Sequence, residues 1–255
     1  MKSIYSSIPV ELCIYGLTHQ KINHLKLLVY LKCFTNGKAQ ISTAKRNAWA
    51  CDIGVSEKWI ISAIKWMIRE KWITINSKKN EYRITSYFKI CRRLQLTCNL
   101  AAKFEAEDFR GFRGFCCAVG LTYFLRRKKW IDRNGRSVSK MDDTSTNRNP
   151  SKKGYVTLPI RYFAKCLGVS VSSANNFKKL AESSGWIKVK PQIAKLLAHG
   201  DKPITKDGYE VFAYAEGKIV GRLRRGTKYL KIVEADLIKS SVICSKKRFK
   251  NGEKL

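Results

Sequence analysis

Two stretches of the chain gather side chains that can hydrogen-bond to base edges or to phosphate. One is a predicted helix rich in small polar groups, with Ser172, Ser173, Asn175, Asn176 and Lys179. Asparagine is a poor helix former, but its amide can donate to adenine N7 and accept from adenine N6 at the same time. The adjacent asparagines therefore indicate base recognition, and plain solvation of one or both is the alternative.

The other stretch is a predicted helix that carries Glu57, Lys58, Ser62 and Lys65 on one side. Lysine donates to guanine or to phosphate, glutamate accepts from cytosine N4, and serine suits either role. Trp59 lies in the same stretch, where a large aromatic side chain either packs into the core or contacts DNA. These residue types make the two helices the candidate reading elements.

Both stretches belong to an internal repeat, because residues 50–73 are similar to residues 164–187 at a constant offset of 114. The matching features are Gly54-Val55-Ser56 with Gly168-Val169-Ser170, and Trp72-Ile73 with Trp186-Ile187. Each glycine can adopt the left-handed conformation that ends a helix, and each serine can cap the next helix. Each copy therefore predicts a helix, a tight turn, a second helix and a strand.

Apolar residues at helical spacing predict which side of each second helix faces the core. In the first copy these residues are Ile60, Ile64 and Met67. In the second copy they are Ala174, Phe177, Leu180 and Ala181.

The segments around each copy complete two similar units. Around the first copy we expect a helix at 21–34, a strand at 39–42, and a hairpin of residues 72–76 and 81–85 with Lys78 and Lys79 at its tip. Around the second copy we expect a helix at 114–130, a strand at 155–158 that leads into Pro159 as a first helical residue, strands at 186–190, 208–215 and 228–233, and an inserted helix at 191–198.

These paired patterns resemble winged-helix DNA-binding domains, and two of them in one small basic chain resemble the initiators of plasmid and phage replication. The resemblance covers about residues 15–90 and 112–235. It implies that the second helix of each turn lies in the major groove while the hairpin wing contacts the backbone or the minor groove. The expected fold class is α+β, with two winged-helix domains in tandem.

The expected domain plan follows from the repeat and from the composition between its copies. We expect a first winged-helix domain at 1–92, a helical linker at 93–111 with its helix near 94–104, a second domain at 112–240 with a mobile loop at 132–154 and an enlarged wing, and a basic tail at 241–255.

The chain is strongly basic, with 51 Lys and Arg against 19 Asp and Glu and a net charge of +32. Such an excess favours a polyanionic partner, because each phosphate that is neutralised releases condensed counterions. Besides the two helices, the basic residues expected to contact DNA are Lys45, Arg46, Lys78, Lys79, Arg222, Arg224 and Arg225. The three arginines are placed in the second wing.

The sequence offers little support for an enzyme, a metal-binding protein or a secreted protein. We expect no enzyme, because the three histidines are scattered and there is no HExxH, P-loop or GxSxG motif. No cofactor and no metal site is expected, since the nine cysteines lack the close pairs that zinc needs. Their odd number and apolar surroundings indicate reduced thiols, and Glu11 interrupts the one apolar run that could suggest a signal peptide.

The sequence therefore predicts a cytoplasmic, or nucleoid-associated, protein that binds specific sites on double-stranded DNA and has no membrane partner. The expected role is initiation of replication of a plasmid, phage or mobile element. A transcriptional regulator and a coating nucleoprotein that binds DNA or RNA without sequence preference are the alternatives. A second copy of the chain or a replication protein is left open as a further partner.

Overall fold

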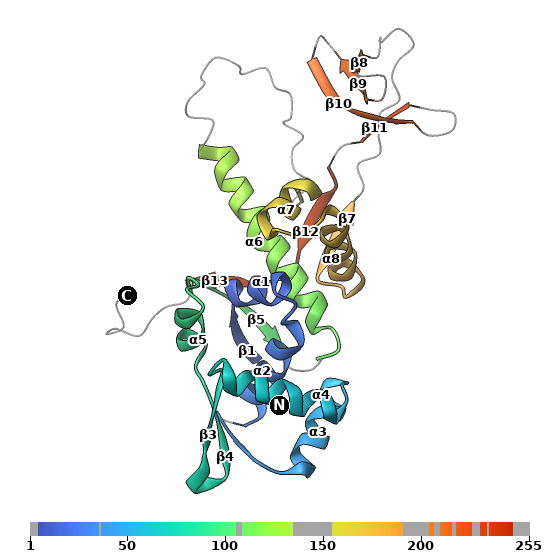
Figure 1. The fold of residues 1–255 in the computed structure, drawn as a ribbon. Helices are drawn as coiled ribbons and strands as arrows, with labels where there is room; N and C mark the ends of the chain where they lie inside the picture. Colours follow the sequence, from blue (N-terminus) through green and yellow to red (C-terminus); the bar gives the residue numbers. More distant parts are fainter. Residues whose placement is uncertain are drawn as a thin grey trace.

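The computed structural model is an α+β protein of short helices and small antiparallel sheets (Figure 1). It describes residues 5–35, 37–105, 109–134, 155–190, 204–206, 210–215, 218–225, 230–233 and 235–246. Within these residues no helix combines the length and the apolar character needed to cross a membrane. Two units with the same order of elements lie on either side of a central sheet.

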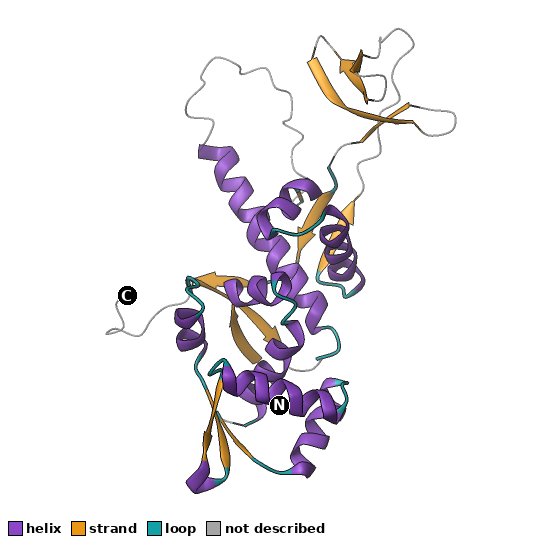
Figure 2. Cartoon of the chain, in the orientation of Figure 1, coloured by secondary structure: helices purple, strands orange, loops and turns teal. Residues whose placement is uncertain are grey.

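The first unit consists of helices that pack against a small sheet (Figure 2). Its elements are α2 (Ile22–Phe34), β2 (Lys38–Gln40), α3 (Thr43–Ile53), α4 (Glu57–Arg69), β3 (Ile73–Asn76), the 3-10 turn η1 (Ser77–Lys79) and β4 (Glu81–Ile84). The strand order is β2-β4-β3, and both pairings are antiparallel. The helices, strand and hairpin predicted around the first copy of the repeat are confirmed.

The turn between α3 and α4 is built as its glycine and serine predict. Gly54 has a φ of 76° and closes α3, with its N–H donating to the Ala50 carbonyl at 2.9 Å. The Ser56 hydroxyl caps α4 by accepting from the Trp59 N–H at 3.2 Å. The direction in which α4 leaves the turn is therefore set by local chemistry.

Helix α2 holds the end of α3 from the other side. The Lys26 ammonium donates to the Ile53 carbonyl at 2.6 Å, and the Tyr30 hydroxyl donates to the Asp52 carboxylate. A cation at the end of α3 is favourable because the last carbonyls of a helix lack partners inside the helix. These two bonds anchor the turn to the unit's first helix.

The second unit repeats the order of the first. Its elements are α6 (Phe112–Asn134), β6 (Val156–Thr157), α7 (Ile160–Leu167), α8 (Val171–Ser183), β7 (Ile187–Lys190) and β12 (Leu237–Ser240). Its strand order, β6-β12-β7, corresponds to that of the first unit. Helix α8 and strand β7 have the same lengths as α4 and β3 and lie 114 residues later.

The second turn also matches its prediction. Gly168 has a φ of 64°, and the Ser170 hydroxyl accepts from the Ser173 N–H at 3.1 Å. Helix α6 lies against the end of α8 so closely that a Cβ on Gly114 would stand 2.0 Å from the Ser184 hydroxyl. The prediction differs by one residue at Pro159, which is the N-cap of α7 rather than its first helical residue.

The hairpin of the second unit differs from the prediction in its second strand. Strand β7 pairs with β12, which was not predicted. The residues between these two strands include a separate sheet. That sheet has the order β11-β10-β9-β8 and contains β8 (Ile204–Lys206), β9 (Glu210–Ala215), β10 (Lys218–Arg225) and β11 (Leu230–Val233). The strands predicted at 208–215 and 228–233 therefore exist but do not extend β7. The helix predicted at 191–198 lies outside the described residues.

A central sheet replaces the predicted helical linker. It has the order β1-β5-β13 and combines β1 (Tyr5–Pro9), β5 (Leu100–Glu105) and β13 (Cys244–Lys246), while α1 (Val10–Thr18) and α5 (Tyr87–Arg93) flank it. The helix expected at 94–104 is wrong, because a short apolar run with buried Ala101, Ala102 and Phe104 fits a middle strand as well as a helix.

Two neighbouring boundaries also change. The predicted tail at 241–255 starts as part of the fold, because Val242 is buried and β13 follows it, with Cys244 paired to Ala102. Residues 247–255 lie outside the description. Helix α6 extends to Asn134, into the loop predicted at 132–154, and residues 135–154 also lie outside the description.

One continuous core joins the two units. Aromatic rings link Tyr30 of α2 to Phe109 (centroids 5.5 Å apart), Phe109 to Phe104 (5.3 Å), Phe104 to Phe115 of α6 (4.9 Å), and Phe115 to Trp186 (5.0 Å). Helix α1 packs along α6 at the same junction. Each buried ring of this size contributes on the order of 2 kcal/mol. The two units are therefore fused rather than strung on a linker.

Candidate nucleic-acid interface

Helix α4 separates a buried face from an exposed row of polar side chains. Ile60, Ile64 and Met67 are buried, as predicted. The exposed row consists of Lys58, Ser62 and Lys65, whose spacing of four and then three residues puts them on one side of the helix. This row can meet a single groove.

Glu57 is held in place by the preceding helix. With the Asn47 amide oriented so that its nitrogen faces α4, that nitrogen donates to both Glu57 carboxylate oxygens at 2.8 and 3.0 Å. A carboxylate has further lone pairs, so Glu57 can still accept from a base. The sequence did not single out Asn47, which fixes the position of this acceptor.

The two basic residues at the start of α3 differ in their freedom. Lys45 is exposed, and its backbone N–H donates to the Ser42 hydroxyl at 3.2 Å. Arg46 is half-buried, and its Nη2 donates to the Thr43 hydroxyl at 3.0 Å. Of the pair, Lys45 is the better placed to reach a phosphate.

The tip of the first hairpin presents two lysines to solvent. Lys78 and Lys79 lie in η1 and are exposed. Asn80 ends the turn with a φ of 46°, and its amide donates to the Ile41 carbonyl at 3.4 Å. The tip is thereby tied to the strand that precedes α3.

Cations stand directly opposite each other on both small sheets. In the first unit exposed Lys38 pairs across the strands with exposed Arg83, and in the second exposed Lys188 pairs with exposed Lys239. Like charges in this position destabilise a sheet. A bound polyanion would remove that penalty.

An acidic neighbour relieves one of these two pairs. Glu81 lies 3.4 Å from Arg83, and its carboxylate accepts from the Asn76 amide at 3.1 Å. The Asn76 bond, followed by those from Arg83 and the charge of Lys38, lowers the pKa of Glu81. The Glu81 carboxylate therefore partly neutralises the Lys38–Arg83 pair of the first sheet. The repulsion between Lys188 and Lys239 on the second sheet is the stronger of the two.

Trp59 belongs to the core rather than to the exposed row. It is half-buried and packs against core residues, with its ring centroid 5.4 Å from that of His24. The His24 ring also meets Trp66 at 4.4 Å. Burial, followed by the charge of Lys21, lowers the pKa of His24 to about 4, so the imidazole is neutral at pH 7. The packing alternative for Trp59 fits this arrangement.

Helix α8 exposes a row at the positions equivalent to those of α4. Ser172, Asn176 and Lys179 are exposed, each 114 residues after Lys58, Ser62 and Lys65. The other two predicted residues are half-buried, and the Ser173 hydroxyl accepts from Ser170 at 2.9 Å. Of the adjacent asparagines, Asn176 points more fully to solvent than Asn175.

Two contacts fix α8 and β12 within the second unit. Lys178 forms a largely buried ion pair with Asp236, just before β12. The Thr122 hydroxyl of α6 lies 2.6 Å from that of Ser240. Lys178 thus serves the fold, although its neighbour Lys179 remains exposed.

The three arginines predicted in the second wing lie in the sheet inserted between its two strands. Arg222, Arg224 and Arg225 are on β10, in the four-stranded sheet inserted between β7 and β12. In the register of that sheet Arg224 pairs with Lys231 of β11. The β7–β12 hairpin itself therefore carries none of the three, and their contact with DNA stays a prediction.

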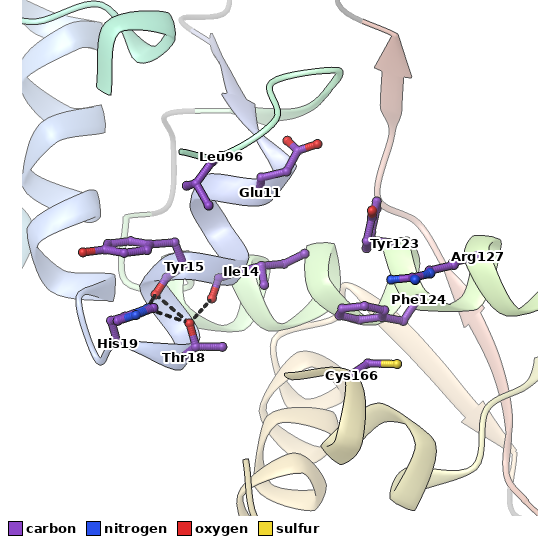
Figure 3. Close-up of a pocket in the computed structure, with 10 residues that line it drawn as sticks. All are labelled: Glu11, Ile14, Tyr15, Thr18, His19, Leu96, Tyr123, Phe124, Arg127 and Cys166. Carbon is purple, nitrogen blue, oxygen red and sulfur yellow. Dashed lines mark hydrogen bonds between the residues drawn. The ribbon is translucent and has the colours of Figure 1, made fainter. Parts of the chain in front are cut away.

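A pocket of about 250 Å³ opens between α1 and the helices α6 and α7 of the second unit (Figure 3). Its lining residues are Glu11, Ile14, Tyr15, Thr18, His19, Leu96, Tyr123, Phe124, Arg127 and Cys166. The Thr18 hydroxyl and the His19 Nδ1 lie 2.8 Å apart and both bond to carbonyls at the end of α1. None of the predicted DNA contacts lines this pocket, so the candidate interface is the outer surface of the helices and hairpins.

No family model, curated protein or solved structure matches the chain. Within the described residues, no group of three or more His, Cys, Asp or Glu side chains could hold a metal ion. The chemistry of the candidate interface is therefore argued from the side chains of the described residues.

The structure adds residues that the sequence did not suggest. Lys188, Lys190 and Lys239 are exposed on the second small sheet, and the Lys190 ammonium lies 4.7 Å from the Tyr155 ring centroid. The signal for Lys188 and Lys190 was their alternation with Ile187 and Val189, which is typical of a half-buried strand.

Proposed function

We propose that this chain binds specific sites on double-stranded DNA through two winged-helix units, with α4 and α8 as the reading helices. The observation that carries the proposal is the pair of exposed rows at equivalent positions, Lys58, Ser62 and Lys65 on α4 and Ser172, Asn176 and Lys179 on α8. Each row follows a glycine turn and a serine cap, the arrangement that presents a recognition helix to the major groove.

The order of elements supports the winged-helix part of the proposal. Each unit runs helix, strand, helix, helix, strand, strand, and its sheet places the last strand in the middle. The β3–β4 and β7–β12 hairpins take the place of the wings. Arg222, Arg224 and Arg225 then lie in a sheet inserted at the second wing.

The distribution of charge supports a polyanionic partner. Lys78 and Lys79 are exposed at the first hairpin tip, and the Lys188–Lys239 pair faces solvent on the second sheet. Such groups contact phosphates and set position along the duplex, whereas the polar residues of the rows distinguish bases. Initiation of replication of a plasmid, phage or mobile element is the role we propose, on the resemblance of the paired units.

Selection of bound duplexes from a random pool tests the proposal. The full chain is expected to enrich two blocks of sequence with a fixed separation of about one helical turn, 10 base pairs. In competition at moderate salt, the enriched duplex should be preferred over random DNA by at least about a thousandfold, the lower end of the range of about 10³–10⁷ for specific over non-specific binding.

A matched pair of variants locates the preference. Lys58→Ala with Ser62→Ala should lose enrichment of one block. Lys103→Ala removes one charge from the central sheet, where Lys103 pairs with Glu105 at 3.0 Å, and should keep both blocks. An unenriched pool would overturn the proposal and favour the coating nucleoprotein, and enrichment of single-stranded RNA over duplex would do the same.

A further inference from the structure

Val171 is an apolar side chain left exposed at the reading surface of α8. It is the first residue of the helix, and 46% of it is open to solvent. Its neighbour Val169 packs against the core, but Val171 does not belong to that cluster. Packing therefore gives no reason for a β-branched residue at this position, which is followed by exposed Ser172.

The equivalent residue of the first unit has the opposite chemistry. Glu57 starts α4, 114 residues earlier, and its carboxylate is held by the Asn47 amide. A carboxylate at this position accepts from a base amino group, whereas two methyl groups cannot hydrogen-bond. The two units thus offer different partners to the base that faces the first turn of the reading helix.

Only one base presents an apolar group in the major groove, and that group is the 5-methyl of thymine. We infer that Val171 contacts a thymine 5-methyl group and makes the second unit select thymine at that position. The inference rests on the proposed function, since it presupposes that α8 enters the groove. Ser172 and Asn176, beside it, supply hydrogen bonds to the neighbouring bases.

Deoxyuridine tests this contact, because it differs from thymidine only in the missing methyl group. The full chain is titrated with the selected duplex and with duplexes in which one thymine at a time is replaced. One position in the second block should lose about fourfold in affinity, the effect expected for one buried methyl group. The Val171→Ala variant should bind the thymine and uracil duplexes at that position equally.

Two further variants separate the loss of the apolar contact from other effects of substitution. Val171→Ser removes the apolar surface while leaving a good helix start, and it should also abolish the uracil effect. Ile243→Ala alters another exposed apolar residue, 66% open to solvent between β12 and β13, and should retain the fourfold difference. Circular dichroism and the melting temperature show that each variant is folded.

The outcomes separate this inference from the proposed function. If the wild-type chain prefers its selected duplex but no uracil replacement weakens binding, the thymine contact is wrong and the proposed function stands. A uracil effect that persists in both Val171 variants also overturns the contact. If the wild type shows no preference for any duplex, the proposed function fails and the inference falls with it.

Discussion

Helices α4 and α8 share their backbone and diverge in the side chains that they expose. Both are 13 residues long, follow a left-handed glycine and begin at a serine cap. Five equivalent pairs on the candidate reading side differ in all but the last: Glu57 with Val171, Lys58 with Ser172, Ile61 with Asn175, Ser62 with Asn176, and Lys65 with Lys179. One geometry therefore presents a charged surface in one unit and a small polar surface in the other.

The comparison shows that different residues specify the fold and the surface. The glycine and serine of each turn fix how the helix leaves the turn, and buried residues such as Ile60 and Ala174 fix which side faces inward. The exposed positions of the two rows differ between the units, while the helix and its buried side stay the same. The hairpins differ as well, since one closes through η1 and the other holds a whole sheet.

The largest expected effect concerns salt. If both units contact DNA and six or more phosphates are engaged, affinity should fall by about a thousandfold or more between about 50 and 200 mM salt. Fluorescence anisotropy measures this directly. Replacing Lys58, Lys65, Lys78 and Lys79 with alanine should make the salt slope shallower by about three to four units.

Replacing Lys179, Lys188, Lys190 and Lys239 in the second unit provides the comparison. An equal change in slope would mean that both units hold phosphates. A change confined to one set would assign the backbone contacts to that unit, and a nearly flat wild-type titration would contradict a phosphate-dominated surface.

The next effect separates base recognition from phosphate binding. Alanine at Asn175 and Asn176 should reduce the preference for the selected site by about 1–3 kcal/mol per lost base contact, with random DNA bound almost as before. Asn176 should account for more of the loss than Asn175, because it is the more exposed of the two. Competition titrations with selected and random duplexes give both numbers.

Alanine at Arg224 and Arg225 should do the reverse. Both classes of duplex should bind more weakly to a similar degree, with the salt slope shallower by about one unit for each phosphate contact removed. Should the asparagine pair weaken all duplexes alike, or have no effect, specificity must lie in α4, around Glu57, Lys58 and Ser62.

A smaller effect compares the two turns. Gly54→Val and Gly168→Val in the full chain should each lower the free energy of unfolding by about 1 kcal/mol or more, because a β-branched residue is strained at positive φ. Apart from the neighbouring residues in the chain, no atom lies within 4 Å of a Cβ built at either glycine, so the cost is backbone strain and not a clash. Chemical denaturation measures it.

Gly54→Asn is the matched control, since asparagine tolerates the left-handed region and should cost less than valine. Because one core joins the units, both valine variants should shift a single transition. Two separate transitions, or no change in either variant, would contradict this account of the turns.

An effect of similar size should appear in the first unit alone. His24 takes up a proton near pH 6.5 in the unfolded chain but only near a pKa of about 4 in the folded one. The unfolded state therefore binds more protons between these values, and stability is lost as pH falls from about 6.5 to 4, by about 1–2 kcal/mol once solvent screening is allowed for.

His24→Phe should remove that part of the acid sensitivity. Hydrogen exchange near pH 5 should accelerate in α4, which packs on His24 through Trp59 and Trp66, more than in α8. Equal acceleration in both helices, unchanged in the variant, would assign the acid sensitivity to other groups.

Local features of the fold could be predicted from the sequence. The glycine turns, the serine caps and the buried face of α4 follow from residue type and spacing within a few positions of each other. The exposed rows follow as well, because they are the remaining side of an amphipathic helix. Their contact with DNA stays a prediction.

The pairing of distant strands could not be predicted. Strand β12 pairs with β7 across the whole insertion, and β5 pairs with β1 and β13 from opposite ends of the chain. Neither segment indicates its partner in its sequence. Leu237–Ser240 is short and alternates apolar with polar residues, and Leu100–Glu105 is a short, mostly apolar run. The exposure and contacts of single side chains could not be predicted either. Only the packed structure shows that Asn175 is less exposed than Asn176 and that the Asn47 amide contacts Glu57.

The aromatic bridge from Tyr30 to Trp186 has a mechanical consequence. If both reading helices engage one duplex, their separation and angle are set by the protein, so a base pair added between the two blocks turns the second block by roughly a tenth of a revolution. Twisting or bending the duplex must then absorb the misfit, at a cost of order 1–6 kcal/mol for bends of 40–90°. The fixed arrangement of the two units would therefore favour sites whose base-pair steps between the blocks deform easily, although no side chain contacts those base pairs.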